Sequence, residues 1–254
     1  MNQKQCDSFL EATLNIGRLM LQYGAEIWKV EDAFTRICKS YNISKVEIHA
    51  ITTQIVATIK TEEGIISTQS VRVGRTSNNL GALEALNTLS RNLCSDKPPV
   101  EDILKMTTDA VSSVKMSYYN CIGYVLSAGA FAVFFGGTWL DGLVASIIGV
   151  FVYFMDKFSK VEDDNKLVLT MIMSFIAGTL SVLFGKFGIG DNVDKIIIGV
   201  VMLFIPSLAL INGVKDMFYR NIMSGLYRVI EAVLTAASIA IGFGSAVVTM
   251  GGIL

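Results

Sequence analysis

The pattern of hydrophobic and polar positions changes close to residue 117. Before that point, apolar residues recur with the spacing of amphipathic helices or strands, and charged residues lie between them. After it, long uncharged runs of about 20 residues alternate with short polar segments, as in helices that cross a bilayer. The sequence therefore predicts a soluble domain over residues 1–117, followed by a transmembrane domain over residues 118–254.

Within the first part, the pattern predicts an α+β domain with the order ααβββαα. Two helices come first, because apolar residues step by three or four from Phe9 to Tyr23 and again from Ile27 to Tyr41. Strict alternation then predicts strands. The remaining elements follow along the chain: strands near Val46–Ala50, Ile55–Ile59 and Ile65–Val73, a helix over about Asn78–Leu93, and a helix from Pro98-Pro99 to near Lys115.

The second part predicts a bundle of five membrane spans. They cover residues 118–137, 139–155, 167–185, 196–214 and 225–254. Lysine and arginine are more frequent in the loops on the side of the N-terminus, which favours N-in, C-out orientation and a cytosolic first domain. Five spans make a thin bundle with opposite-facing ends, so we expect a partner subunit or self-association.

The stretch from residue 196 to residue 231 carries the clearest functional signal. Pro206 interrupts an uncharged run of 19 residues, and a polar segment with Asn212, Asp216 and Asn221 follows. Glu231 then lies about two turns inside the last predicted span. A broken helix, a polar hinge and an intramembrane carboxylate together indicate a transport pathway.

Each of these features also has a structural explanation. Pro206 could be a tolerated kink, the hinge a solvated loop, and Glu231 the partner of Arg228 or Lys215 near the inner surface. Asp141, at the start of the second predicted span, could cap that helix or serve the pathway.

Composition narrows the class of protein. The chain is 52% hydrophobic, which fits a membrane protein, and its net charge of −1 gives no reason to expect a nucleic-acid partner. Four scattered cysteines and a single histidine, His49, predict no metal site, and we expect no cofactor. The sequence contains no phosphate-binding motif of the G-x-x-x-x-G-K-[ST] type, so direct ATP coupling by this chain is not expected.

Three segments resemble the threonine/serine exporter (ThrE-type) family. Gly24-Ala25-Glu26-Ile27-Trp28-Lys29-Val30-Glu31-Asp32 is similar to its GAE-x-aromatic-R-V-E-D signature, and Phe135 to Asp141 is similar to its FGG-x-W-x-D turn. Pro206 to Gly225, which includes Asn212, Asp216 and Ser224, resembles a third family segment, followed by a carboxylate that Glu231 matches. Two positions depart from the pattern: Lys29 replaces an arginine, and Ser207 replaces a glycine.

The resemblance implies a transporter rather than an enzyme. It implies export of small polar metabolites, either threonine/serine-type amino acids or dicarboxylates such as succinate, across a bacterial plasma membrane. The chain is similar to the larger subunit of split, two-component members, whose partner would be a small membrane protein of four or five spans. The implied pathway residues are Pro206, Asn212, Asp216, Asn221, Ser224, Glu231 and Asp141, and the implied signature residues of the cytosolic domain are Gly24, Ala25, Glu26, Lys29, Val30 and Glu31.

Two other functions stay open at this point. The chain could be a membrane-anchored enzyme, or a metabolite sensor that acts through its N-terminal domain.

Overall fold

The computed structural model describes residues 1–74, 76–114, 119–158 and 166–251. They form two compact units. The first unit comprises Met1–Lys115 together with Leu208–Val229, and the second comprises Met116–Ser207 together with Ile230–Leu254. Each unit is therefore built from two separate stretches of the chain.

The first unit contains a small sheet and a set of helices in the predicted order. Its N-terminal stretch consists of α1 (Gln3–Gln22), α2 (Ile27–Ser40), β1 (Ile43–Ile51), β2 (Gln54–Thr61), β3 (Ile66–Arg72), α3 (Leu80–Asp96) and α4 (Val100–Ser112). Helix α1 begins at a capping box in which Asn2 and Gln5 each bond the other's backbone N–H. Asn79 caps α3 through the N–H of Ala82.

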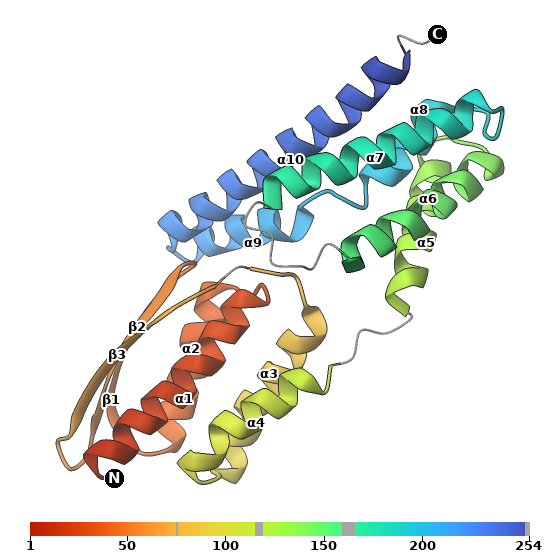
Figure 1. Cartoon of the computed structure of the whole chain (residues 1–254). Helices are drawn as coiled ribbons and strands as arrows, with labels where there is room; N and C mark the ends of the chain where they lie inside the picture. Colours follow the sequence, from red (N-terminus) through yellow and green to blue (C-terminus); the bar gives the residue numbers. More distant parts are fainter. Residues whose placement is uncertain (75, 115–118, 159–165, 252–254) are drawn as a thin grey trace. The chain divides into compact units, whose positions relative to one another are not determined.

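The sheet is antiparallel with the strand order β1-β2-β3. The pairing of Ile48 with Ala57, and of Ala57 with Gln69, aligns the inward positions of all three strands. Ile55, Ala57 and Ile59 are at most 1% exposed, so the predicted alternation along β2 is confirmed. Helices α1 and α2 cover this inner face, and α3 and α4 form a further layer behind them (Figure 1).

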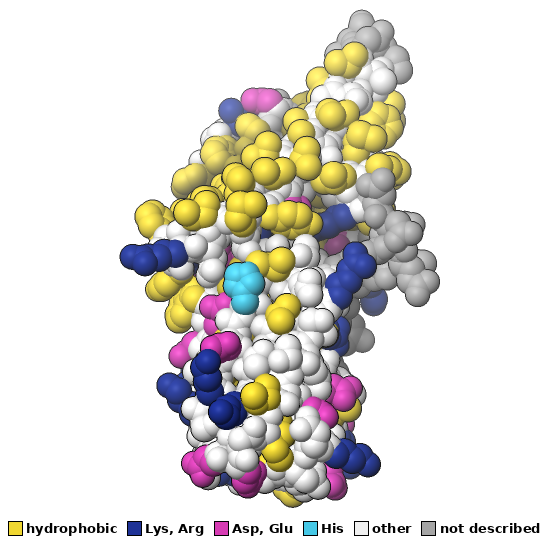
Figure 2. Space-filling view, turned by 90° about the vertical axis from the view of Figure 1, so that its left-hand side faces the viewer, with side chains coloured by type: hydrophobic (Ala, Val, Ile, Leu, Met, Phe, Trp, Pro, Cys, Tyr) yellow, Lys and Arg dark blue, Asp and Glu magenta, His cyan; other side chains and the backbone are white. Residues whose placement is uncertain are grey.

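The outer face of the sheet differs sharply from the surface of the second unit. Figure 2 shows mainly charged and other polar side chains over the sheet, with few hydrophobic ones among them. Hydrophobic side chains dominate the surface of the apolar helices in the same view. The outer face of the sheet thus has a water-facing surface, whereas the apolar helices of the second unit have the surface of a protein embedded in lipid.

The stretch predicted as one span broken at Pro206 consists of two helices, α8 (Val193–Val201) and α9 (Ser207–Phe218). Pro206 directly precedes α9, where its missing N–H is not needed and where it disfavours helical geometry at Ile205. Part of the predicted polar hinge is helical, because α9 continues through Asp216 to Phe218. Helix α9 and the start of α10 (Ile222–Gly251), up to Val229, belong to the first unit.

The second unit contains α5 (Tyr119–Phe134), α6 (Trp139–Phe158), α7 (Lys166–Lys186), α8 and the remainder of α10. Small residues let these helices approach closely. A Cβ at Gly199 would lie 2.6 Å from the carbonyl oxygen of Ala128, and one at Gly242 would lie 2.5 Å from that of Met171. Gly244 is different, since a Cβ there would meet nothing within 4 Å.

Within the described part of the chain, three helices are long and apolar enough to cross a membrane: Trp139–Phe158, Lys166–Lys186 and Ile222–Met250. Residues Asn120–Phe134 form a shorter apolar helix. The protein is therefore mostly helical, with candidate membrane spans and one small three-stranded sheet.

Candidate functional site

Helix α2 begins without a cap of its own. Glu26 occupies the N-cap position, but its side chain makes no capping hydrogen bond. Instead, Oδ1 of Asp216 in α9 accepts the backbone N–H of Ile27 at 3.0 Å. Asp216 is fully buried, and its carboxylate lies at the N-terminal end of α2, where the helix dipole favours negative charge. A residue 189 positions away along the chain thus supplies the missing cap.

Two carbonyl groups of the loop before α2 are bound from the same side. The Gly24 carbonyl accepts a hydrogen bond from Nδ2 of Asn212 at 3.0 Å, and the Ala25 carbonyl accepts one from Nη2 of Arg228 at 2.7 Å. Gly24 has a φ of +95°, which L-residues rarely adopt, so glycine is required for this turn. The turn between α1 and α2 is therefore held by α9 and by the first turns of α10.

Ion pairs reinforce this arrangement. Glu26 is 5% exposed, and its two oxygens pair with Lys29 at 2.7 Å and with Lys215 at 2.9 Å. Burial by itself would raise the pKa of Glu26, but the hydrogen bonds from the two lysines outweigh it and leave the pKa below its usual range. Arg228 Nε lies 3.2 Å from Oδ2 of Asp216, and both side chains are buried.

An aromatic pair extends the contact. The rings of Trp28 and Tyr219 stack with their centroids 4.8 Å apart, and Lys29 Nζ lies 5.5 Å from the Trp28 ring centroid. We call the whole contact the α2 clamp. It consists of Gly24, Ala25, Glu26, Ile27, Trp28 and Lys29 on one side, and Asn212, Lys215, Asp216, Tyr219 and Arg228 on the other.

The clamp unites two of the three segments that the sequence singled out. Gly24, Ala25, Glu26 and Lys29 come from the N-terminal signature, whereas Asn212 and Asp216 come from the stretch after Pro206. Two further signature residues support the position of α2. They are Val30, which is fully buried in the core, and Glu31, whose Oε1 accepts the N–H of Ala50 in β1 at 3.0 Å.

Backbone hydrogen bonds of Asn221 hold the turn from α9 into α10. The N–H of Asn221 donates to the Asp216 carbonyl at 2.9 Å, and the Asn221 carbonyl accepts the N–H of Gly225 at 2.9 Å. Ser224 is 4% exposed. Gly213 and Gly225 lie against each other, since a Cβ on Gly213 would be 2.9 Å from the Gly225 carbonyl oxygen. This close approach brings Arg228 within reach of Asp216.

In the second unit, Asp141 holds a loop in place. Its Oδ1 accepts the N–H groups of Asp191 and Asn192 at 2.7 and 2.9 Å. Its Oδ2 accepts the N–H of Thr138 at 2.8 Å and Nδ2 of Asn192 at 3.1 Å. Asp141 therefore caps α6 and also fixes the loop between α7 and α8.

Glu231 lies in α10 and faces Lys166 at the start of α7. Their side chains approach to 3.5 Å, and the Glu231 side chain is 30% exposed. This partner differs from Arg228 and Lys215, the partners that the structural explanation of Glu231 named.

Sequence reasoning did not anticipate the roles of Lys215, Arg228, Trp28 and Tyr219. Arg228 carried a usable signal, because a charge inside a predicted span calls for an opposite charge nearby. The weak N-cap at Glu26 was a second signal, since an uncapped helix needs an outside acceptor.

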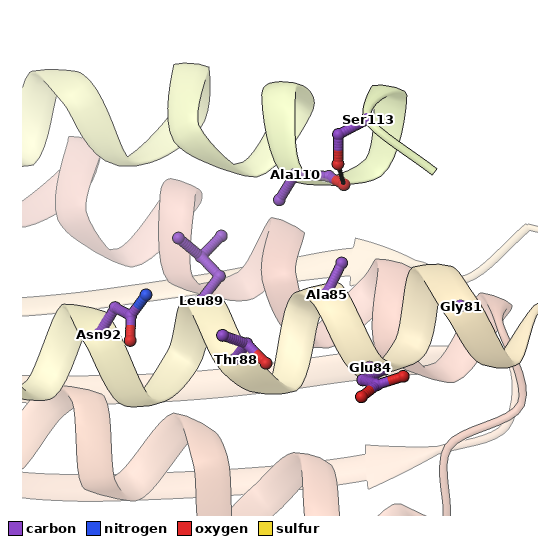
Figure 3. A pocket seen from close by; sticks show the side chains of 8 residues that line it. All are labelled: Gly81, Glu84, Ala85, Thr88, Leu89, Asn92, Ala110 and Ser113. Atoms are coloured by element: carbon purple, nitrogen blue, oxygen red, sulfur yellow. Dashed lines mark hydrogen bonds between the residues drawn. The ribbon is translucent and has the colours of Figure 1, made fainter. Parts of the chain in front are cut away.

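Other features of the first unit offer less chemistry. A groove of about 460 Å³ between α3 and α4 is lined mainly by small and uncharged polar side chains, with Glu84 at its edge (Figure 3). Among the described residues, no three or more His, Cys, Asp and Glu side chains group together to hold a metal ion.

The apolar helices define a membrane protein that also carries a folded α+β domain. A family model described as "Putative threonine/serine exporter" matches residues 11–250, nearly the whole chain. The chain therefore belongs to the threonine/serine exporter family, which is a family of transporters.

A protein from the fission yeast Schizosaccharomyces pombe, described as uncharacterized, is 22% identical over 248 residues. The match covers 92% of this chain but only 29% of the yeast protein. Because that relative is fungal, family membership does not by itself assign the chain to a bacterial membrane. No solved structure matches the chain.

Proposed function

We propose that this chain is a subunit of a secondary transporter that exports small polar metabolites. The cargo is a threonine/serine-type amino acid or a dicarboxylate such as succinate. Family membership supports the transporter class. The observation that carries the mechanism is the α2 clamp, because it attaches the soluble domain to the chain segment that follows Pro206.

In the proposed mechanism, the backbone bends at Pro206, and the α2 clamp transmits movement of the soluble domain to this point. Pro206 has no N–H to donate, so the backbone between α8 and α9 lacks the bonds that stiffen a continuous helix. The clamp holds α9 through hydrogen bonds that involve charged groups, each worth about 1.5–3 kcal/mol. A displacement of the soluble domain is therefore transmitted through α9 to the hinge at Pro206 and to the start of α10.

The proposed topology has five membrane segments over about 118–137, 139–155, 167–185, 196–214 and 225–254, the fourth interrupted between α8 and α9, with the N-terminus inside and the C-terminus outside. The excess of basic residues on the inner side supports it. Residues 1–117 form the cytosolic domain, and the protein lies in the plasma membrane. A second membrane subunit of four or five spans, or a second copy of the chain, completes the bundle.

Within this scheme, the expected pathway residues have distinct tasks. Asn212 and Asp216 link the hinge to the cytosolic domain, while Asn221 and Ser224 shape the turn into α10. Glu231 is the proposed coupling carboxylate. Its partial exposure and its separation of 3.5 Å from Lys166 support this role, because neither feature locks it into a tight buried pair. Asp141 holds the loop before α8.

Reconstituted transport tests the proposal. The chain is placed in proteoliposomes alone and together with a candidate partner, a four- or five-span membrane protein of the same family, and the movement of labelled threonine, serine and succinate is measured under an ion gradient. We expect gradient-driven movement of at least one of the three when both proteins are present. The same rate as in protein-free liposomes, for all three compounds, would refute the transporter proposal.

A Glu231→Gln variant tests the coupling role separately. If Glu231 carries the coupling proton, this variant loses the pH dependence of flux while it remains folded and inserted. A Glu231→Gln variant with the same gradient-driven flux as the wild type at every pH would remove Glu231 from the coupling step.

A further inference from the structure

A small cavity lies in the first unit beside the α2 clamp. Its volume is about 140 Å³, and its walls come from the end of α1, the turn before α2, the start of α2, α3 and α9. This volume corresponds to roughly four or five water molecules, far below the pockets of about 300–1,000 Å³ that hold drug-sized ligands. Only a metabolite of a few heavy atoms fits.

The walls carry both signs of charge. Glu26 and Lys29 line the cavity from α2, so an acid and a base stand side by side on one wall. Each oxygen of Glu26 accepts one bond from a lysine, which leaves acceptor capacity on both oxygens. Lys29 is 46% exposed and has three N–H donors, only one of which is needed for Glu26.

Amide side chains complete the polar lining. Asn78 and Asn87 face the cavity from the α3 side, and Asn212 faces it from α9. Asn212 uses its Nδ2 for the Gly24 carbonyl, which leaves its Oδ1 as an acceptor. Leu80, Leu83 and Leu208 supply an apolar patch. The cavity thus offers an acid, a base, amides and a little apolar surface.

From this lining we propose that the cavity binds a small amino acid as its zwitterion. The ammonium group is placed at Glu26, the carboxylate at Lys29, and a short polar side chain at Asn78 and Asn87. Glu26 and Lys29 are the two charged residues of the lining, while Lys215 binds Glu26 from outside it, so the cavity offers one acidic and one basic group to a zwitterion. The binding of an amino acid is argued from the cavity alone. That the bound amino acid is also the exported cargo rests on the proposed function.

An amino acid bound in the cavity would act directly on the α2 clamp. Glu26, Lys29 and Asn212 belong both to the cavity and to the clamp, so a bound amino acid shares their hydrogen bonds. A ligand that prefers the closed clamp shifts the soluble domain toward it by its difference in affinity for the two states. The conformation at the Pro206 hinge would then depend on the concentration of the amino acid.

Calorimetric titration of the full chain in nanodiscs tests the site. The ligands are L-serine and L-threonine, with ethanolamine as serine without its carboxylate and 3-hydroxypropionate as serine without its ammonium. We expect saturable binding of an amino acid, and binding weaker by roughly tenfold or more for each singly charged analogue. No saturable heat for either amino acid, or equal affinity for an analogue, would overturn the proposal.

Two variants localise the binding. Asn87→Leu removes an amide from the cavity, and Leu83→Phe fills it, while neither residue belongs to the clamp. Each is expected to weaken binding by roughly tenfold or more. Asn92→Leu makes the same chemical change further along α3, outside the cavity, and is expected to bind like the wild type. Thermal unfolding of each variant shows whether it is folded.

If Asn87→Leu and Leu83→Phe both bind the amino acid with wild-type affinity, the proposed binding site is wrong. The flux measurement separates the two proposals: binding without flux keeps the site and rejects the exporter in favour of a sensor, whereas flux without binding rejects the site and keeps the exporter.

Discussion

Oδ1 of Asp216 lies 3.0 Å from the backbone nitrogen of Ile27, so the carboxylate caps a helix that begins 189 residues earlier. This bond explains why two distant segments both matter to the protein. The signature around Gly24 supplies a helix start with open N–H and carbonyl groups, and the segment after Pro206 supplies the side chains that occupy them. The result is a soluble domain attached to the entry of α10.

Loss of the Asp216 carboxylate is expected to open the clamp. Asp216→Ala removes a hydrogen bond to a charged group, worth about 1.5–3 kcal/mol, from the otherwise uncapped N–H of Ile27. Hydrogen exchange at the Ile27 amide should therefore accelerate by roughly tenfold or more. The matched control is Asp194→Ala, because the Asp194 side chain is 67% exposed and pairs only at the surface. Equal protection in the two variants would contradict the capping role.

Gly24 is expected to tolerate no side chain. With its φ of +95°, alanine at this position adopts strained backbone geometry at a cost of about 1–2 kcal/mol, and its Cβ would also lie 3.2 Å from Oδ1 of Asn78. Gly24→Ala should lower the unfolding temperature of the first unit. Gly74→Ala is the control, since that glycine has ordinary φ and open space around it. An unfolding temperature unchanged by Gly24→Ala would show that the turn can rearrange.

The clamp should weaken in acid because of Glu26. Its pKa is lowered when Lys29 and Lys215 bind it, so at acidic pH the released form takes up more protons than the clamped form. The contribution of Glu26 is complete above its ordinary pKa of about 4.3 and declines as the pH falls below that value. Burial raises the pKa of the neighbouring Asp216 despite the opposing charge of Arg228, so the titration of Asp216 acts in the opposite direction.

Comparison with Glu26→Gln isolates this effect. Between about pH 5 and pH 3, the wild type should lose more protection of the Ile27 amide, corrected for intrinsic exchange, than Glu26→Gln. Glu62→Gln, at an exposed hairpin position, should behave like the wild type. Parallel pH profiles for the wild type and Glu26→Gln would rule out the assigned role of Glu26.

Asp141 is expected to be a structural residue of the second unit. Asparagine at this position turns one acceptor oxygen into a donor and leaves two of the four N–H groups around it without an acceptor, at about 1–3 kcal/mol each. Asp141→Asn should therefore lower thermal stability in detergent, while Asp191→Asn, an exposed residue of the same loop, should leave it unchanged. Full stability with reduced flux would instead place Asp141 in the transport pathway.

Local patterns in the sequence were sufficient to predict the α+β order and the inward faces of β1 and β2, because alternation and helical spacing report burial directly. The polar segment after Pro206 placed Asn212 and Asp216 among the residues of interest, and the family resemblance added Gly24 and Glu26. Sequence could not predict that these residues meet, since a tertiary helix cap leaves no periodic signal. The break at Pro206 was predicted, but the grouping of α9 with the first unit was not. Hydropathy is continuous from Ile196 to Val214 and does not record where the backbone turns.

Amino-acid efflux in a matched pair of variants tests the central claim most directly. Labelled L-threonine efflux is measured for the wild type, Asp216→Ala and Asp194→Ala, each with the proposed partner subunit and at equal amounts in the membrane. If the α2 clamp couples the soluble domain to the hinge at Pro206, Asp216→Ala loses roughly tenfold or more of the efflux rate and Asp194→Ala keeps it. Wild-type efflux in Asp216→Ala, together with a released Ile27 amide, would contradict this mechanism.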